Sequence, residues 1–304
     1  MQKITLRYSL KTTTRLDQAI AQSSEAETHK LSRSLIRKLI VAGAVYVNGK
    51  RVRVASRQVH GGETIDLYWN KEKSPENLSE KNFPPLRVLY EDDAIICFDK
   101  PAGLPTQPTL DEARLNLFQM AKHQLANQLK KPSIYLGLHH RLDRDTSGVL
   151  LFTRATEHNA FIADQFKLHK CVKVYVAMVH GRLKNPKGRL ESFLAQVGKS
   201  GKSAKFGSVR SGGKKAITDF LVLGQNESYS LVEVRIATGR THQIRVHFSE
   251  MGHPIVGDSL YGSSPAEYKR WGRFLLHAHA LTIEHPVTHN LVRIESPIPP
   301  EFRL

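Results

Sequence analysis

The segment from His140 to Leu151 carries the strongest chemical pattern in the sequence. It places Asp143 between Arg141 and Arg144, immediately before an apolar run that has the character of a strand. A carboxylate between two guanidinium groups would be paired and held in one geometry, which a nucleophile or an acid–base group requires. The alternative interpretation is a solvated charged loop, which is the usual outcome for alternating charges.

Three further segments favour the chemical interpretation. They are Lys-Pro-Ala-Gly-Leu at 100–104, Lys-Val-Tyr-Val-Ala-Met-Val-His-Gly at 173–181, and Thr-Gly-Arg-Thr-His-Gln-Ile-Arg-Val-His at 238–247, the last continued by 252–255 and 257–262. With 140–151, and in this order and spacing, they resemble the RluA-type family of pseudouridine synthases. The resemblance extends over about residues 86–300, much further than a short motif that arises by chance.

The resemblance implies an isomerase that turns uridine in RNA into pseudouridine. The reaction breaks the bond from ribose to uracil nitrogen-1 and rejoins the base through carbon-5, without a change in redox state. We therefore expect no cofactor and no metal. It needs an essential carboxylate, a partner that keeps it ionised, and a pocket for a flipped base.

The same resemblance assigns residues to these roles. Asp143 matches the catalytic aspartate, and Arg245 matches a buried guanidinium expected to form a bidentate pair with it. Tyr175 matches an aromatic residue that stacks on the base and could move a proton. Arg141, on the same face of an extended chain as Asp143, matches a residue that enters the RNA where the base leaves. Whether Asp143 attacks the sugar, attacks the base or acts as a base on the ribose stays open.

Other charged residues in these motifs are expected to have structural or RNA-contacting roles rather than catalytic ones. Arg144 and Asp145 would form a surface ion pair. Arg240 contacts either a phosphate or a structural partner. His242 and His247 are five apart, a spacing that disfavours metal ligation on one helical face. The remaining histidines of these segments are expected to be structural or to face RNA; they are His139, His140, His277 and His279.

The composition favours a polyanionic partner. The chain has 304 residues and a formal net charge of +17, with 40% hydrophobic and 24% charged residues. Nucleic acid is the first candidate and an anionic membrane surface the second. No apolar run reaches the roughly 18–20 residues needed to span a bilayer, and the first residues have no secretory apolar region. Cys97 and Cys171 lie in apolar surroundings, so we expect reduced, buried thiols and a cytoplasmic protein.

Residues 1–69 are predicted to form a small N-terminal α/β domain. Apolar residues from Leu31 to Ile40 recur at helical spacing, with Ser32 or Thr28 as the cap and Gly43 as the end. The strand 45–47 leads into Asn48-Gly49, a hairpin turn, and 50–54 and 63–67 are further strands.

This domain resembles the S-four RNA-binding domain. The matching pieces are Arg15-Leu16-Asp17, Ser32-Arg33-Ser34, the segment 40–47 and Val47-Asn48-Gly49-Lys50, and no acidic residue occurs between Lys30 and Arg57. The alternative is a basic face that only improves solubility. The residues expected to contact RNA here are Lys30, Arg33, Arg37, Lys50, Arg51 and Arg53.

Residues 70–85 are polar and proline-containing and are predicted to be a linker. Residues 86–304 would form the catalytic domain, an α+β pseudouridine synthase fold with a largely antiparallel mixed sheet. The expected strands are 87–91, 94–99, 147–154, 172–181, 216–224, 229–237 and 280–285. The expected helices are 114–128, 156–168 and 241–251.

Residues 198–215 are rich in glycine, serine and lysine and are predicted to be a loop. Two Gly-Lys-Ser triplets imitate a phosphate-binding loop, but Phe193 and Gln196 stand where that motif needs its first glycine. The segment is either a mobile loop or a basic flap that closes on RNA, through Lys202 and Lys214.

These observations predict an RNA pseudouridine synthase, and its two-domain arrangement resembles enzymes that modify large-subunit ribosomal RNA. Transfer RNA is the alternative substrate, because some members of the family modify it. A non-catalytic RNA-binding or ribosome-assembly factor on the same fold is the alternative function. We expect a monomer, since no segment resembles a dimer interface.

Overall fold

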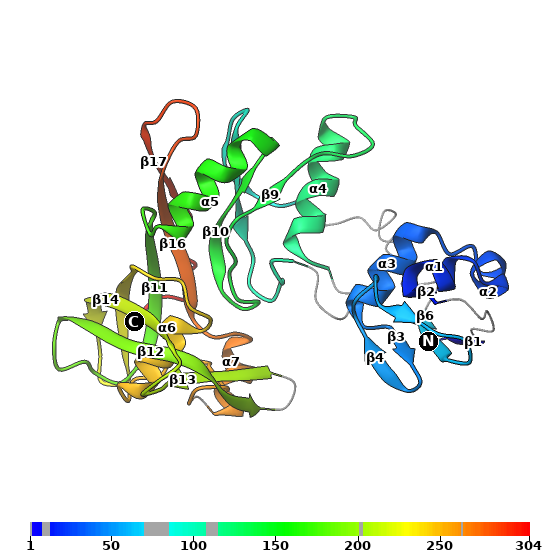
Figure 1. Ribbon diagram of the computed structural model, residues 1–304. Helices are drawn as coiled ribbons and strands as arrows, with labels where there is room; N and C mark the ends of the chain where they lie inside the picture. The colour runs from blue at the N-terminus through cyan, green and yellow to red at the C-terminus, as the bar shows by residue number, and fades with distance from the viewer. Residues whose placement is uncertain (1, 8–12, 70–84, 108–114, 201–202, 263) are drawn as a thin grey trace. The chain divides into compact units, whose positions relative to one another are not determined.

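The structure is a computed structural model that describes residues 2–7, 13–69, 85–107, 115–200, 203–262 and 264–304 (Figure 1). The chain divides into two compact units, one within residues 1–84 and 108–115 and the other within residues 85–107 and 116–304. Of the predicted linker, residues 70–84 lie outside the described residues. Each unit has its own sheet and its own core.

The first unit contains a four-stranded antiparallel sheet, in the order β1 (Gln2–Arg7), β6 (Thr64–Trp69), β3 (Val45–Val47), β4 (Lys50–Val52). A short pair, β2 (Thr14–Arg15) and β5 (Gln58–Val59), lies apart from it. The helices are α1 (Leu16–Ala21), α2 (Ser24–Thr28) and α3 (Arg33–Ala42).

Local sequence explains α3 and the hairpin that follows it. The Ser32 hydroxyl accepts a hydrogen bond from the Leu35 amide at 3.2 Å, and Gly43, with φ 78°, ends the helix. The predicted apolar stripe is buried. Asn48 and Gly49 have φ 49° and 73°, as a tight hairpin turn between β3 and β4 requires. Lys30, one of the residues expected to contact RNA, precedes the helix.

In the second unit, eleven of the described strands form one sheet, and its nine-strand path runs β13-β12-β14-β15-β11-β16-β10-β8-β7. β17 pairs with β16, and β9 pairs with β10. All these pairs are antiparallel except β10 with β16. The predicted largely antiparallel α+β fold is therefore confirmed. The strands are β7 (Val88–Glu91), β8 (Ile95–Lys100), β9 (Gly137–Leu138), β10 (Ser147–Thr153), β11 (Val172–His180), β12 (Lys187–Ser200), β13 (Ser203–Ser208), β14 (Lys214–Gln225), β15 (Tyr229–Ile236), β16 (Leu276–Glu284) and β17 (Leu291–Glu295).

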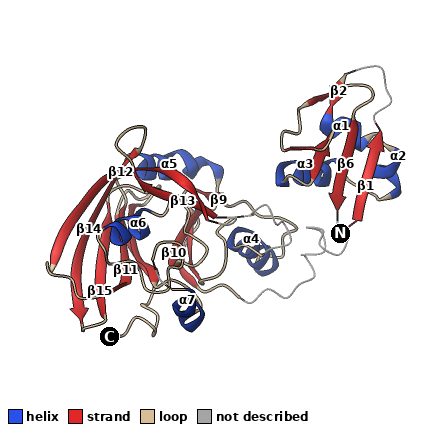
Figure 2. Cartoon of the chain, turned by 90° about the horizontal axis from the view of Figure 1, so that it is seen from below, coloured by secondary structure: helices blue, strands red, loops and turns tan. Residues whose placement is uncertain are grey.

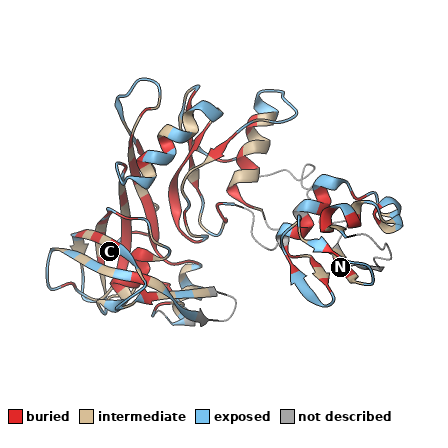
Figure 3. Cartoon of the chain, in the orientation of Figure 1, coloured by how far each residue is buried: buried red, intermediate tan, exposed pale blue. Residues whose placement is uncertain are grey.

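The helices of this unit are α4 (Leu117–Gln128), α5 (Asn159–Lys167), α6 (Gln243–Glu250) and α7 (Pro265–Trp271), with a short 3₁₀ turn at Thr156–His158. Figures 1 and 2 show α6 against β14 and β13. Ile162 of α5 packs in one core cluster with Val149 and Leu151 of β10. Buried residues run along the central strands (Figure 3). Cys97 and Cys171 are buried free thiols, as predicted. In the described part of the chain, no helix is both long and apolar enough to cross a membrane.

The predicted loop at 198–215 is wrong for most of its described length. β12 extends to Ser200 and pairs with β13, and β14 begins at Lys214, so that only 209–213 connect strands as a loop. The hairpin was not predicted because the segment is rich in residues of low strand propensity, such as glycine and lysine. Pairing with the neighbouring strands stabilises the hairpin instead. Lys202 lies outside the described residues, and Lys214 is exposed on β14.

Candidate active site

Four neighbouring strands bring the predicted residues together. β16 lies between β10 and β11, and β15 pairs with the other edge of β11. The segment that carries Asp143 enters β10, Tyr175 lies on β11, and the chain leaving β15 turns through 237–242 into α6, which carries Arg245. The pairing of β11 with β16 shifts register between Val174 and Val176, where three steps along β16, from Ala280 to His277, correspond to two along β11. The extra residue therefore lies on β16, opposite Tyr175. Bulges commonly re-aim a side chain next to an active site.

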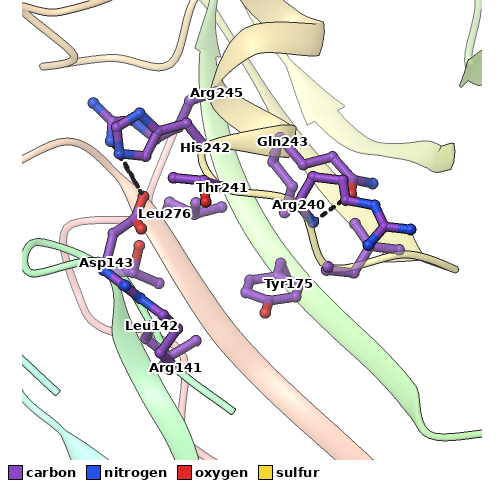
Figure 4. Close-up of a pocket in the computed structure, with 14 residues that line it drawn as sticks. Arg141, Leu142, Asp143, Tyr175, Arg240, Thr241, His242, Gln243, Arg245 and Leu276 are labelled. Carbon is purple, nitrogen blue, oxygen red and sulfur yellow. Dashed lines mark hydrogen bonds and ion pairs between the residues drawn. The ribbon is translucent and has the colours of Figure 1, made fainter. Parts of the chain in front are cut away.

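These segments line a cavity of about 110 Å³. Figure 4 shows Asp143 and Arg141 on one side of it, Arg240 on the other, and Tyr175 between them. Arg245 lies above Asp143. All five were predicted from the sequence, and the structure places them around one pocket.

Arg245 joins two carboxylates, only one of which was predicted. Its Nη1 lies 3.2 Å from Oδ2 of Asp143, while its Nε and Nη2 donate to the two oxygens of Asp258 at 2.7 and 2.9 Å. The prediction of a bidentate pair with Asp143 is therefore wrong. Asp258 forms the bidentate pair with Arg245, and Asp143 accepts a single hydrogen bond from it. Burial disfavours the charge of Arg245, but the two aspartates outweigh it and raise its pKa.

Asp258 is held by the turn that precedes it. Gly257 has φ 79°, and a Cβ at this position would lie 2.2 Å from the carbonyl oxygen of Arg273. Only glycine fits such a close approach of two backbones. Asp258 itself is buried. The motif at 257–262 contained this residue, but neither its charge nor its spacing showed that it would take the fork of Arg245.

Two further side chains fix the backbone on either side of Asp143. The Thr106 hydroxyl donates to the carbonyl of Leu142 at 2.8 Å and accepts from its amide at 3.1 Å. The ammonium of Lys100 donates to the carbonyls of Pro101, Leu104 and Arg144 at 2.8–2.9 Å. Burial lowers the pKa of Lys100 to about 7, yet three accepting carbonyls require the protonated form, which alone has three donors. Lys100 lies in the Lys-Pro-Ala-Gly-Leu motif, whose residue types alone do not indicate this role.

His242 also lines the pocket, although its spacing from His247 bore only on metal ligation. It has φ 57° just before α6, and its Nε2 lies 3.8 Å from Oδ2 of Asp143. The Tyr261 hydroxyl accepts a hydrogen bond from the Phe206 amide and lies 2.9 Å from Nδ1 of His242. Nδ1 and this hydroxyl share one hydrogen bond, and the neutral imidazole in it is either the Nε2–H tautomer with Tyr261 as donor or the Nδ1–H tautomer with Tyr261 as acceptor. Burial lowers the pKa of His242, which favours this neutral ring.

The side chains of Tyr175 and Arg141 form no hydrogen bond with another described residue, although Tyr175 packs against the core. Burial and the charge of Asp143 raise the pKa of the Tyr175 phenol, which favours its protonated form. Arg141 is exposed, and within the described residues it forms no ion pair. Arg240 donates from Nε to the carbonyl of Lys215 at 2.9 Å, which fixes its position and leaves its other nitrogens available.

The pair of Arg144 and Asp145 differs from its prediction. Two hydrogen bonds of 2.8 Å join them, but Asp145 is buried, so the pair is only half at the surface.

The other histidines have structural contacts. His140 accepts from the Leu151 amide, His277 lies 2.8 Å from the Ser147 hydroxyl, and His139 lies 3.0 Å from the Thr153 hydroxyl. His279 lies 2.8 Å from the carbonyl of Ser296.

In the first unit, the predicted RNA-binding residues are exposed, but two of them also have partners. Arg37 donates to Asp17 at 2.8 Å, and together with Arg15 it lowers the pKa of that buried carboxyl to about 2. Arg51 donates to the Tyr46 hydroxyl at 2.8 Å. The other four predicted residues are exposed and have no ion pair in the described structure; they are Lys30, Arg33, Lys50 and Arg53.

Comparison with known proteins identifies the family. A family model described as RNA pseudouridylate synthase matches residues 94–250, about half of the chain, and an S4 domain model matches residues 14–65. The chain belongs to the RNA pseudouridylate synthase family, of the RluA type, and is an isomerase that acts on RNA. The predicted family and the predicted N-terminal RNA-binding domain are thus confirmed.

Individual relatives agree with this assignment. An uncharacterised RNA pseudouridine synthase of Mycoplasma pneumoniae is 33% identical over 298 residues, covering 97% of this chain and 92% of that protein. The ribosomal large subunit pseudouridine synthase D of Borreliella burgdorferi is 32% identical, covering 89% of this chain and 82% of that protein. Among solved structures, human RNA pseudouridylate synthase domain containing 1 superposes with a TM-score of 0.58 at 26% identity, covering 70% of this chain and 83% of that one.

Proposed function

We propose that this enzyme isomerises specific uridines of large-subunit ribosomal RNA, with Asp143 as the essential carboxylate and with the target base flipped into the pocket. One observation carries the proposal: the Asp143 carboxylate lies in the wall of the pocket beside Tyr175, with Oδ2 held by Arg245 at 3.2 Å. Among the described groups, none hydrogen bonds to Oδ1 of Asp143. This second oxygen is therefore available to the nucleotide.

The surroundings of Asp143 suit a group that must stay charged and in place. Arg245 supplies a permanent positive charge on one side, and Lys100 and Thr106 hold the backbone on either side. Such preorganised charges cost no rearrangement at the moment of reaction. The proposal requires only that Oδ1 meets the nucleotide, at the sugar or at the base, when C1′ leaves nitrogen-1 and joins carbon-5.

Tyr175 and Arg141 complete the proposed site. The Tyr175 ring offers a face on which uracil stacks, and its protonated hydroxyl is a donor for a late proton transfer. Arg141 is exposed at the rim of the same pocket. Its guanidinium can enter the space that the base leaves and so offset the unstacking, which costs a few kcal/mol.

The ribosomal substrate is proposed from the relatives and from the first unit. Several relatives of similar length are named ribosomal large subunit pseudouridine synthase D. The exposed cations of the S4 domain provide a second contact with a large RNA. We further propose that the enzyme works in the cytoplasm, because Cys97 and Cys171 are free thiols, and as a monomer, because no segment of the sequence resembles a dimer interface.

The test is tritium release from RNA labelled at uracil carbon-5, with unmodified ribosomal and transfer RNA as separate substrates. We expect the wild type to release tritium from ribosomal RNA. Asp143→Asn should release none and still bind the RNA, because the substitution removes the charge and keeps the shape. Release by Asp143→Asn at the wild-type rate would exclude the mechanism, and release by neither protein would favour the non-catalytic alternative.

A further inference from the structure

A second, larger cavity opens beside the base pocket. Its volume is about 530 Å³, and the two cavities share five lining residues, namely Arg141, Tyr175, Ile236, Gly239 and Arg240. A group that enters one cavity therefore borders the other. Ala163, Phe166 and Lys167 of α5 form its outer wall, and His140 stacks on Phe166 with ring centroids 4.6 Å apart.

The lining of this cavity is positively charged. It contains Arg141, Lys167, Lys173 and Arg240, and no carboxylate among the described residues lines it. A concave surface with one sign of charge concentrates ions of the opposite sign. The cavity is therefore suited to an anion.

Lys173 is partly buried and has no side-chain hydrogen bond among the described residues, whereas Arg141 and Lys167 are exposed and Arg240 bonds to a carbonyl. It lies on β11 two residues before Tyr175, so that both side chains leave the strand on the same face. Its ammonium passes over Gly239, where an added Cβ would lie 3.6 Å from Nζ. Within the described structure it has no ion pair, and its burial together with the charge of Arg240 lowers its pKa. A partly buried charge without a partner destabilises the protein unless a ligand supplies the opposite charge.

We propose that this cavity is a phosphate subsite that binds the RNA backbone next to the flipped uridine, with Lys173 as its principal ligand. The proposal rests on the proposed function, because base flipping rotates the nucleotide about its backbone and leaves its phosphates beside the base pocket. Arg240, fixed by the carbonyl of Lys215, provides a second ligand. Ala163 and Phe166 of α5 provide an apolar surface for the adjoining sugar.

The test compares Lys173→Met with Lys173→Arg, and uses Lys184→Met as the matched control. Lys184 is exposed just beyond the far end of β11 and lines neither cavity. Filter binding of unmodified ribosomal RNA over a range of salt concentrations, and KM for tritium release, are measured for each protein. We expect Lys173→Met to weaken binding and raise KM several-fold, on the order of 3- to 10-fold, and to reduce the salt slope by about 1.

Lys173→Arg keeps the charge and should retain most of the affinity, and Lys184→Met should behave as the wild type. The melting temperature separates the subsite from a structural role. Removal of an unpaired buried charge leaves it equal or higher, whereas loss of a structural lysine lowers it. Unchanged affinity and salt slope in Lys173→Met, or a loss that accompanies a lower melting temperature, would overturn the subsite.

Competition with inorganic phosphate gives an independent readout. Phosphate should compete with RNA for the wild type more strongly than for Lys173→Met. Because filter binding does not need turnover, failure of the wild type to release tritium would contradict the proposed function and still leave the subsite measurable. Equal competition by phosphate in both proteins would count against the subsite.

Discussion

At the scale of single residues, the site depends on how one guanidinium is shared. Arg245 is buried and donates from Nε and Nη2 to the two oxygens of Asp258, which leaves Nη1 to donate to Asp143. The arrangement orients Arg245 rigidly, so that its contact with Asp143 does not depend on the substrate. Preorganisation of this kind is more effective than a flexible pair, because the donor is already in place.

Asp258→Asn should therefore reduce both stability and turnover. It removes the charge that compensates a buried guanidinium, and breaking a buried pair in this way costs about 3–5 kcal/mol. Asp143 would then be the remaining partner of Arg245 and would be drawn toward it. The free energy of unfolding in urea and the rate of tritium release measure the two effects.

Asp219→Asn is the matched control for this prediction. Asp219 accepts two hydrogen bonds from Arg189 at 2.7 and 3.0 Å, but the pair is solvent-exposed, and such pairs contribute little. Stability and activity should both stay close to those of the wild type. If Asp258→Asn behaved like Asp219→Asn, Arg245 would not need its buried partner.

At the scale of elements, β16 decides where the catalytic segment lies. β10 pairs with β16 in parallel through Ser147 and Gly148 only, and β11 pairs with the opposite edge of β16. This short parallel contact places the residues before β10 beside Tyr175. It depends on Gly148, which has φ 112° and at which a Cβ would lie 2.1 Å from the carbonyl oxygen of Ala278.

Gly148→Ala should destabilise the protein by more than about 2 kcal/mol, because the new methyl group meets backbone and the φ angle is strained. Tritium release should fall further than stability alone explains, since Asp143 lies five residues earlier. Thermal unfolding and single-turnover release test this prediction. Gly198→Ala is the control, because nothing lies within 4 Å of a Cβ at that position on β12. Equal melting temperatures for the two variants would contradict the proposed close approach.

At the scale of the whole molecule, the positive charge is divided between two units with separate tasks. The second unit contains the pocket, and the first contributes the exposed cations of an RNA-binding domain. The whole chain of 304 residues has a formal net charge of +17. Binding to a large RNA should therefore depend steeply on salt, because each phosphate contact releases counterions.

Deletion of residues 1–80 should weaken RNA binding and flatten the dependence of log affinity on log salt. Each phosphate contact that is lost lowers the slope by roughly 0.7–0.9. Filter binding of unmodified ribosomal RNA at several salt concentrations measures the slope, with Asp143→Asn of full length as the control that should keep it. A slope that does not change after the deletion would mean that the basic face of the first unit does not touch RNA.

The sequence by itself determined the family, the α+β class and the identity of five of the fourteen residues that line the pocket. These features depend on local patterns: the Arg-Leu-Asp-Arg run, the alternation of strands, and the capped helix that ends at Gly43. Asp143, Tyr175, Arg245 and Arg141 could be given roles in advance, because each lies in a motif that resembles the pseudouridine synthase family. Arg240 lies in one of these motifs as well, but its role was left open.

Only the tertiary structure decided how these residues are held. Three sets of contacts join positions that are apart in the chain. Arg245 is shared between Asp143 and Asp258, Lys100 and Thr106 hydrogen bond to the backbone on either side of Asp143, and the Tyr261 hydroxyl contacts His242. The hairpin of β12 and β13 was missed for the same reason, since its stability comes from neighbouring strands rather than from its own residues. Contacts of this kind are fixed by strand register and packing, which a single sequence does not specify.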